Sequence, residues 1–347
     1  MRSDTPTSQA QAAASLRAVF LHGLWRSGST YVWSRFRAAE GTCCYYEPLH
    51  DGLARLTRAR IARDTPEAVQ HNRHPAMEQP YFAEFKPLVG LRGVKGYQRR
   101  FAYSRFAPAS TDQDPALEGY VRRLIDQAHR ENRSPVLGFN RTGLRIGWLA
   151  RRFDAYNIHI DRDPIDVFSS YVSQLHDGNH YYFVKWMQII AGNPDYPLFR
   201  AALPLFRQPS AIELLLRGPR KYYRDVVSES SLVTLYSVTF LAWATCALHA
   251  LEHSDLIMDI ALADRPGYLG QLAEAVRHGS GLSVTFDDMH APAPSPPLHL
   301  SQQRAIERDV LSWIGSVAED GLFDRARIRA RLGELSPRRA GLLARVI

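Results

Sequence analysis

The chain has 347 residues, of which 45% are hydrophobic and 22% charged, enough apolar material for the core of one large soluble domain. A formal net charge of +8 favours anionic ligands, but the basic residues are scattered, which argues against nucleic-acid binding as the main role. The cysteines Cys43, Cys44 and Cys246 lack a zinc-ligand spacing, and we expect reduced thiols in a cytoplasmic protein.

The beginning of the chain combines a polar lead-in with the first regular elements. Residues 1–15 lack the apolar core of a secretory signal, so we expect a disordered lead-in before a single domain over residues 16–347. The apolar run at residues 17–23 predicts a buried strand, and residues 30–40 have a helical pattern.

The connection between this strand and helix is almost a phosphate-binding P-loop. Gly23 and Gly28 form the G-x-x-x-x-G frame and Thr30 closes it, but Ser29 stands where a nucleotide triphosphatase needs Lys. The basic residue, Arg26, comes three positions earlier. The loop therefore suggests a phosphorylated donor other than a nucleoside triphosphate.

A loop of this kind binds anions mainly through its backbone. Five N–H groups, from Ser27 through Tyr31, are expected to face the anion at a helix N-terminus, with the Ser29 and Thr30 hydroxyls and the planar Arg26 cation as further donors. The alternative is an ordinary helix N-cap, for which Ser and Gly are also suited.

The middle of the chain alternates strands and helices after an irregular, Arg- and Pro-rich stretch at about 51–115. The predicted elements are a strand at 43–48, a helix at 116–131, a strand at 134–140, a helix at 144–153, a strand at 156–164 and a helix at 166–176. This alternation predicts an α/β fold with a central parallel sheet flanked by helices, in a three-layer, P-loop-like arrangement.

A second irregular stretch, rich in aromatic and basic residues, is predicted at about 177–230, so the domain has two large insertions. A strand at 255–262, a helix at 268–279 and a Pro-rich extended segment at 291–300 follow. Residues 232–251 contain no Asp, Glu, Lys or Arg and are long enough to span a bilayer. Because they hold several hydroxyl residues and a His, we favour a buried core helix over an integral membrane span.

A second motif lies at the end of the strand at 156–164. Arg162 ends the strand, Pro164 suits the start of the next helix, and Ser170 follows eight residues after Arg162, two turns into that helix. Arg162 and Ser170 can therefore converge on one anion. The alternative is a turn in which Arg162 pairs with Asp163 or Asp166.

Together the two motifs resemble those of the sulfotransferases that use 3′-phosphoadenosine-5′-phosphosulfate. Residues 26–30 are similar to the 5′-phosphosulfate loop in the Arg-containing form of the carbohydrate sulfotransferases, and residues 162–171 to the 3′-phosphate motif. The resemblance covers about half of the chain, without the two insertions, and implies the fold predicted above. It implies that Arg162 and Ser170 bind the 3′-phosphate, and that residues 26–30 bind the phosphosulfate with Arg26 as an electrostatic clamp.

The resemblance also suggests residues for the acceptor side. Glu47, in a segment similar to one of the carbohydrate sulfotransferases, is the expected base, with His50 as the alternative; a strand-end salt bridge is the other interpretation of Glu47. Arg141 is a candidate contact for the sulfuryl group or acceptor, and Tyr31 lies where relatives place an aromatic ring against the adenine.

The expected activity is transfer of a sulfuryl group to a hydroxyl of a carbohydrate or glycoconjugate, without a metal ion. A protein tyrosine, a lipid or a small metabolite stays open as acceptor. The alternatives are a P-loop kinase that uses ATP, which the missing Lys argues against, and a non-catalytic anion-binding protein.

Overall fold

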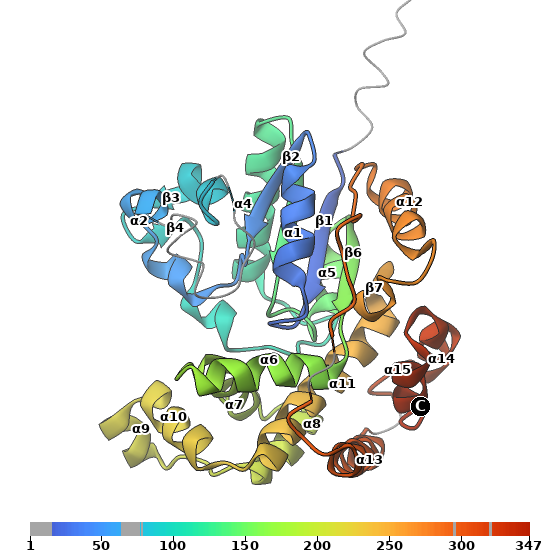
Figure 1. The fold of residues 1–347 in the computed structure, drawn as a ribbon. Helices are drawn as coiled ribbons and strands as arrows, with labels where there is room; N and C mark the ends of the chain where they lie inside the picture. Colours follow the sequence, from blue (N-terminus) through green and yellow to red (C-terminus); the bar gives the residue numbers. More distant parts are fainter. Residues whose placement is uncertain (1–15, 64–76, 78, 294–295, 319–320) are drawn as a thin grey trace, which may run out of the picture.

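The computed structural model describes residues 16–63, 77, 79–293, 296–318 and 321–347 (Figure 1), so the expected lead-in at residues 1–15 lies outside the described residues. Five parallel strands form a sheet in the order β2-β5-β1-β6-β7. The strands are β1 (Ala18–Gly23), β2 (Thr42–Tyr46), β5 (Ser134–Phe139), β6 (Ala155–Asp161) and β7 (Leu256–Asp259). A short hairpin of β3 (Val89–Gly90) and β4 (Gly93–Val94) stands apart from this sheet.

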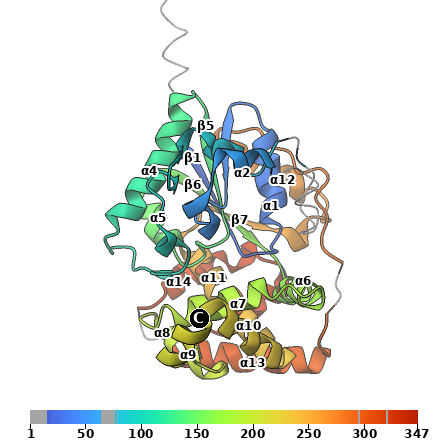
Figure 2. The ribbon, with the colours of Figure 1, turned by 90° about the vertical axis from the view of Figure 1, so that its left-hand side faces the viewer.

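Helices cover both faces of the sheet, as Figure 2 shows from the side. On one face lie α1 (Ser29–Ala38) and α12 (Tyr268–Ser280), and on the other α4 (Pro115–Arg130) and α5 (Ile146–Arg152). The side chains of β1 alternate between two separate apolar clusters, with Val19 and Leu21 facing α1 and Phe20 facing α4. Burial on both faces favours apolar side chains, which explains the apolar run at residues 18–21 of β1. The predicted α/β class and flanked parallel sheet are therefore confirmed.

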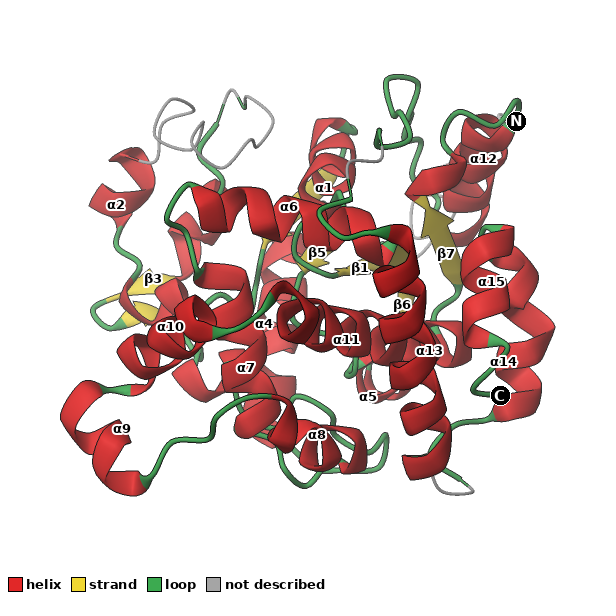
Figure 3. Cartoon of the chain, turned by 60° about the horizontal axis from the view of Figure 1, so that its bottom comes forward, coloured by secondary structure: helices red, strands yellow, loops and turns green. Residues whose placement is uncertain are grey.

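The remaining helices form a layer beyond the carboxyl ends of the strands (Figure 3). They are α6 (Pro164–His176), α7 (Tyr181–Ala191), α8 (Pro197–Ala202), α9 (Ala211–Arg217), α10 (Pro219–Glu229), α11 (Leu232–His253), α13 (Leu300–Val317), α14 (Arg325–Arg331) and α15 (Pro337–Leu343). A third apolar cluster joins α6, α7, α11 and α13.

The prediction of irregular structure at 177–230 is wrong, because four helices, α7 to α10, lie there. The aromatic residues of α7, among them Phe183 and Trp186, are buried in the third cluster, and this tertiary packing overrides their weak helix propensity. Among the described residues of the stretch at 51–115, α2 (Arg58–Arg63), three short 3-10 helices and the β3–β4 hairpin interrupt the irregular chain. The strand predicted at 156–164 ends at Asp161, because Pro164 starts α6.

The apolar segment near residue 240 is the long helix α11. Among the described residues it is the one helix long and apolar enough to cross a membrane, yet 72% of its most apolar window is buried inside the protein. This burial agrees with its interpretation as a core helix.

Arg339 joins the C-terminal helix α15 to the ends of two strands. Its side chain is fully buried, Nη1 lies 2.5 Å from Asp161 Oδ2 at the end of β6, and Nη2 pairs with Asp259 at the end of β7. Because Arg162 directly follows Asp161, this contact fixes the strand end from which Arg162 extends.

Replacing Arg339 by Met should lower the free energy of unfolding by about 3–5 kcal/mol, because it leaves two buried carboxylates without their cation. Urea unfolding of the variant and of Arg345→Met, an exposed residue of the same segment, measures the difference. A loss no larger than that of Arg345→Met would contradict the stabilising role.

His22 of β1 is buried between Thr142 and Asn157, to which its Nδ1 and Nε2 are 2.7 and 3.1 Å distant. Burial lowers its pKa from 6.5 to about 3. The unfolded chain therefore binds more protons between these two values, and stability falls as the pH falls through this window. We expect His22 to change the free energy of unfolding by up to about 1.4 kcal/mol per pH unit in this window. The variant His22→Gln should lose this pH dependence, whereas His278→Gln, a change at an exposed residue, should keep it. If the free energy of unfolding depended equally on pH in the two variants, the role given to His22 would be wrong.

Candidate functional site

The loop after β1 lies at the point where the sheet topology reverses. The chain leaves β1 toward β5 and β2 on one side, whereas β6 and β7 lie on the other. Ligands of open α/β sheets bind at the carboxyl ends of strands at such a point. Arg26 in this loop and Glu47 after β2 have φ values of 66° and 40°, two of four positive values among non-glycine residues in the described part of the chain. Such strained backbones concentrate at functional sites.

Gly28 is the N-cap of α1, with φ 88°, and a Cβ there would lie 2.4 Å from Ile260 Cδ1. Within the described residues no side chain caps this helix. The first N–H groups of a helix have no intrahelical acceptor, so those of residues 28–31 are available for an anion. The Ser27 N–H differs from the expectation, because it donates to Leu24 O at 3.2 Å.

The hydroxyl groups of the loop contact the protein itself. Ser29 Oγ donates to Asn140 Oδ1 at 2.6 Å, and Thr30 Oγ1 lies 3.0 Å from the Tyr46 hydroxyl. Ser27 Oγ donates to Leu24 O. The groups best placed for an anion are therefore the backbone N–H groups and the arginines.

The two sequence motifs meet at this loop. Arg26 Nε donates to Ser170 Oγ at 2.8 Å, and Arg162 Nη1 donates to the Arg26 carbonyl at 2.9 Å. Arg162 Nε is buried and has no hydrogen-bond partner among the residues that the structure describes. Burial lowers the pKa of Arg162, and the Arg26 charge adds to this while Asp166 opposes it. A half-buried guanidinium with an unpartnered donor fits a site for an anionic ligand.

A pocket of about 250 Å³ opens beside the loop. Its lining residues are Gly28, Tyr31, Arg162, Ile260, Asp288, Met289, His290 and Pro292. The Tyr31 hydroxyl donates to Asp288 Oδ1 at 2.5 Å, which fixes one edge of its ring. Tyr31 and Arg162 therefore line the same pocket. Residues 286–290 gave no sequence signal, whereas Pro292 belongs to the Pro-rich segment predicted at 291–300.

Glu47 is buried close to the loop and is held on both carboxylate oxygens. Asn140 Nδ2 donates to Oε1 at 2.9 Å and Arg141 Nη1 donates to Oε2 at 2.8 Å. Since Asn140 also accepts from Ser29, a continuous hydrogen-bond chain links the loop to Glu47. The salt bridge that was the alternative interpretation of Glu47 is thus present, but it lies within the site.

His50 has its Nδ1 occupied, since this atom accepts the Gly52 N–H at 3.0 Å. Burial and the nearby Arg141 charge lower the pKa of His50, so the ring is neutral at neutral pH. A neutral ring that accepts at Nδ1 carries its proton on Nε2. Its remaining nitrogen is therefore a donor, and Glu47 is the better base of the two.

Further polar residues next to Glu47 come from α7 and the stretch at 51–115, and sequence reasoning missed them. Arg141 Nη2 donates to the Tyr181 hydroxyl at 2.7 Å and lies 3.6 Å from Asp51 Oδ1. Lys185 Nζ lies 3.4 Å from Asp51 Oδ2, and burial lowers its pKa to about 8 although Asp51 opposes the shift. The richness of the stretch at about 177–230 in aromatic and basic residues was the one sequence signal for Tyr181 and Lys185.

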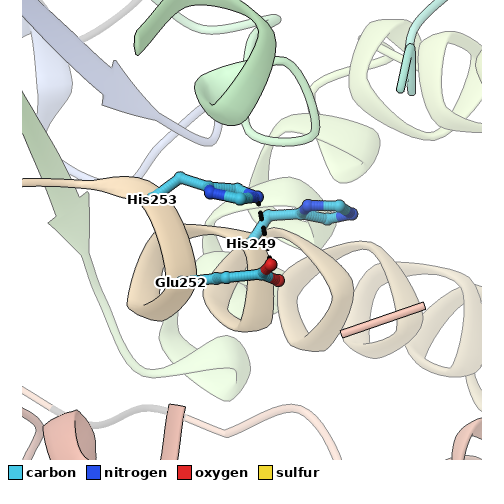
Figure 4. A group of neighbouring side chains, drawn as sticks. All are labelled: His249, Glu252 and His253. Atoms are coloured by element: carbon cyan, nitrogen blue, oxygen red, sulfur yellow. Dashed lines mark ion pairs between the residues drawn. The ribbon is translucent and has the colours of Figure 1, made fainter. Parts of the chain in front are cut away.

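A separate group of possible metal ligands lies near the end of α11 (Figure 4). His249, Glu252 and His253 each offer one ligand atom within 4.8 Å of the others. However, the Tyr196 hydroxyl lies 3.1 Å from His249 Nε2, and the charges of Arg327 and Arg151 act on His253. Nearby cations oppose binding of a metal ion, and we place no metal there.

Comparison of the chain with protein-family models, with curated proteins and with solved structures gives no match.

Proposed function

We propose that the protein is a sulfotransferase that moves a sulfuryl group from 3′-phosphoadenosine-5′-phosphosulfate to an acceptor hydroxyl. One observation carries this proposal: Arg26 contacts both Ser170 and Arg162 beside the N-terminus of α1, which no side chain of the described residues caps. The residues that we assign to the 5′ and 3′ ends of one nucleotide are therefore neighbours, which supports the proposal. The proposal includes a single P-loop-like domain over residues 16–347, with insertions at about 51–115 and 177–230.

The residues present fit this donor. The N–H groups of residues 28–31 and the Arg26 guanidinium suit the phosphosulfate, and Arg162 with Ser170 suits the 3′-phosphate. Tyr31 in the pocket supplies an aromatic surface for the adenine. Arg26 keeps its proton, so it stabilises the negative charge that grows on the departing phosphate without acting as an acid.

On the acceptor side, Glu47 takes the proton of the acceptor hydroxyl as its oxygen bonds to sulfur. The bond between sulfur and the phosphate oxygen breaks, and adenosine 3′,5′-bisphosphate leaves with the electron pair. Arg141 and Asn140 hold the Glu47 carboxylate in one orientation, which is the role of a positioning residue. We propose a carbohydrate or glycoconjugate as the acceptor, since the polar groups of Tyr181, Asp51 and Lys185 adjoin Arg141.

Binding of adenosine 3′,5′-bisphosphate tests the proposal. We expect the bisphosphate to raise the melting temperature in the presence of a metal chelator, and adenosine 5′-monophosphate, which lacks the 3′-phosphate, to have a much smaller effect. Stabilisation by Mg-ATP alone would favour the kinase instead, and equal effects of the bisphosphate and the monophosphate would remove the role given to Arg162.

A further inference from the structure

The helix α9 has an apolar surface that no described part of the chain covers. Ile212, Leu215 and Leu216 are 69%, 85% and 77% exposed, and none of the seven residues of α9 is buried. The helix lies at the edge of the molecule in Figures 1 and 3, next to α10. Large apolar side chains gathered at one exposed place usually mark an interaction surface.

The ends of α9 are fixed by local interactions rather than by packing. Ser210 and Glu213 form a capping box, in which each side chain bonds to the backbone of the other. At the other end Gly218, with φ 69°, ends the helix. These caps offset the lack of burial, so a short helix keeps its apolar side chains in water without support from a core.

Basic residues are frequent in the chain around α9 and in α10, which packs against it. Residues 200–225 contain six Arg or Lys and two acidic residues, a net charge of +4. Arg220, Lys221 and Arg224 of α10 are exposed. The two acids are paired locally, Glu213 with Arg207 and Asp225 with Arg217. The exposed apolar residues of α9 thus adjoin a helix, α10, with exposed basic residues.

We propose that α9 and the basic residues of α10 dock on a membrane surface that contains anionic lipids. Apolar side chains enter the boundary between head groups and acyl chains, while Arg and Lys attract anionic head groups. A second copy of the chain fits the same surface less well, because a two-fold contact through α9 would bring the basic residues of α10 from both copies close together. The proposal concerns a surface and does not depend on the reaction.

Vesicle sedimentation tests this proposal with the whole chain. The protein should sediment with phosphatidylglycerol-containing vesicles and much less with pure phosphatidylcholine vesicles, and added salt should weaken binding. The double variant Leu215→Ser/Leu216→Ser should bind the anionic vesicles about tenfold more weakly or worse, because each leucine loses its transfer into the bilayer. Arg220→Glu/Lys221→Glu should weaken binding to anionic vesicles alone.

Leu91→Ser is the matched control, because Leu91, like Leu215 and Leu216, is an exposed leucine. It lies in the turn between β3 and β4, outside the α9 surface. We expect its vesicle binding to equal that of the unchanged protein, and all variants to keep the same melting temperature. Equal binding of the double leucine variant and Leu91→Ser would overturn the proposal. So would an absence of binding to either vesicle, or a dimer in light scattering that the double variant abolishes.

Discussion

Replacing Arg162 by Ala should weaken the binding of adenosine 3′,5′-bisphosphate by about 100-fold, the largest effect on donor binding that we expect of a single substitution. Arg162 brings to the pocket that also contains Tyr31 a half-buried positive charge and a buried Nε, which has no partner in the described part of the chain. A charge-assisted hydrogen bond in such surroundings contributes about 1.5–3 kcal/mol, and two of them to one phosphate account for the expected factor. Isothermal titration measures the change.

The same titration with adenosine 5′-monophosphate separates a local effect from a general one. Because the monophosphate has no group for Arg162 to bind, its weak affinity should change little in the Ala variant. Arg162→Lys should recover part of the bisphosphate affinity, since it restores the charge without the planar fork. Arg308→Ala, which removes an exposed arginine on α13, is the control. Undiminished bisphosphate binding by Arg162→Ala would count decisively against the site.

Replacing Glu47 by Gln should lower kcat by about 100-fold or more and leave bisphosphate binding unchanged. Gln has nearly the shape of Glu, but its amide cannot take a proton from the acceptor. Asn140 bridges Glu47 and the Ser29 hydroxyl of the loop through two hydrogen bonds. The Glu47 carboxylate is therefore close to the position that we expect for the sulfuryl group. Turnover of labelled donor, with the bisphosphate titration as a test of folding, measures both quantities.

His50→Asn is the matched variant for Glu47→Gln. The Asn side-chain oxygen can accept the Gly52 N–H as His50 Nδ1 does, so the local turn is kept. If Glu47 is the base, this variant should keep most of its turnover. The opposite pair of results, a slow His50→Asn and an active Glu47→Gln, would move the role of base to His50.

The central sheet was predictable because its strands carry strong local signals. β1 is an apolar run that ends at Gly23, and the end of β6 is marked by Pro164, which starts α6. The stretch at 177–230 has no such signal. α7 is rich in aromatic and β-branched residues with low helix propensity, and only its contacts with distant helices stabilise it.

The candidate site was predictable to the extent that each motif is continuous in the sequence. The segments around Arg26 and Arg162 were found separately, and the contact between Arg26 and Ser170, 144 residues apart, fits their expected use on one ligand. The sequence did not reveal that Asn140 and Arg141 are the hydrogen-bond partners of Glu47. Asn140 and Arg141 reach it across 93 and 94 residues, because β2 and β5 are neighbours in the sheet, and no local pattern reveals a neighbouring strand.

Transfer from sulfur-labelled 3′-phosphoadenosine-5′-phosphosulfate to a panel of polysaccharide, glycolipid, peptide and phenolic acceptors, in a metal chelator, tests the central claim most directly. The account predicts a labelled sulfate ester on at least one hydroxyl acceptor, with an equal amount of adenosine 3′,5′-bisphosphate released. It also predicts that the variants Arg162→Ala and Glu47→Gln do not transfer this label to the acceptor. Magnesium-dependent transfer of phosphate from labelled ATP, with no transfer of sulfate to any acceptor, would contradict it.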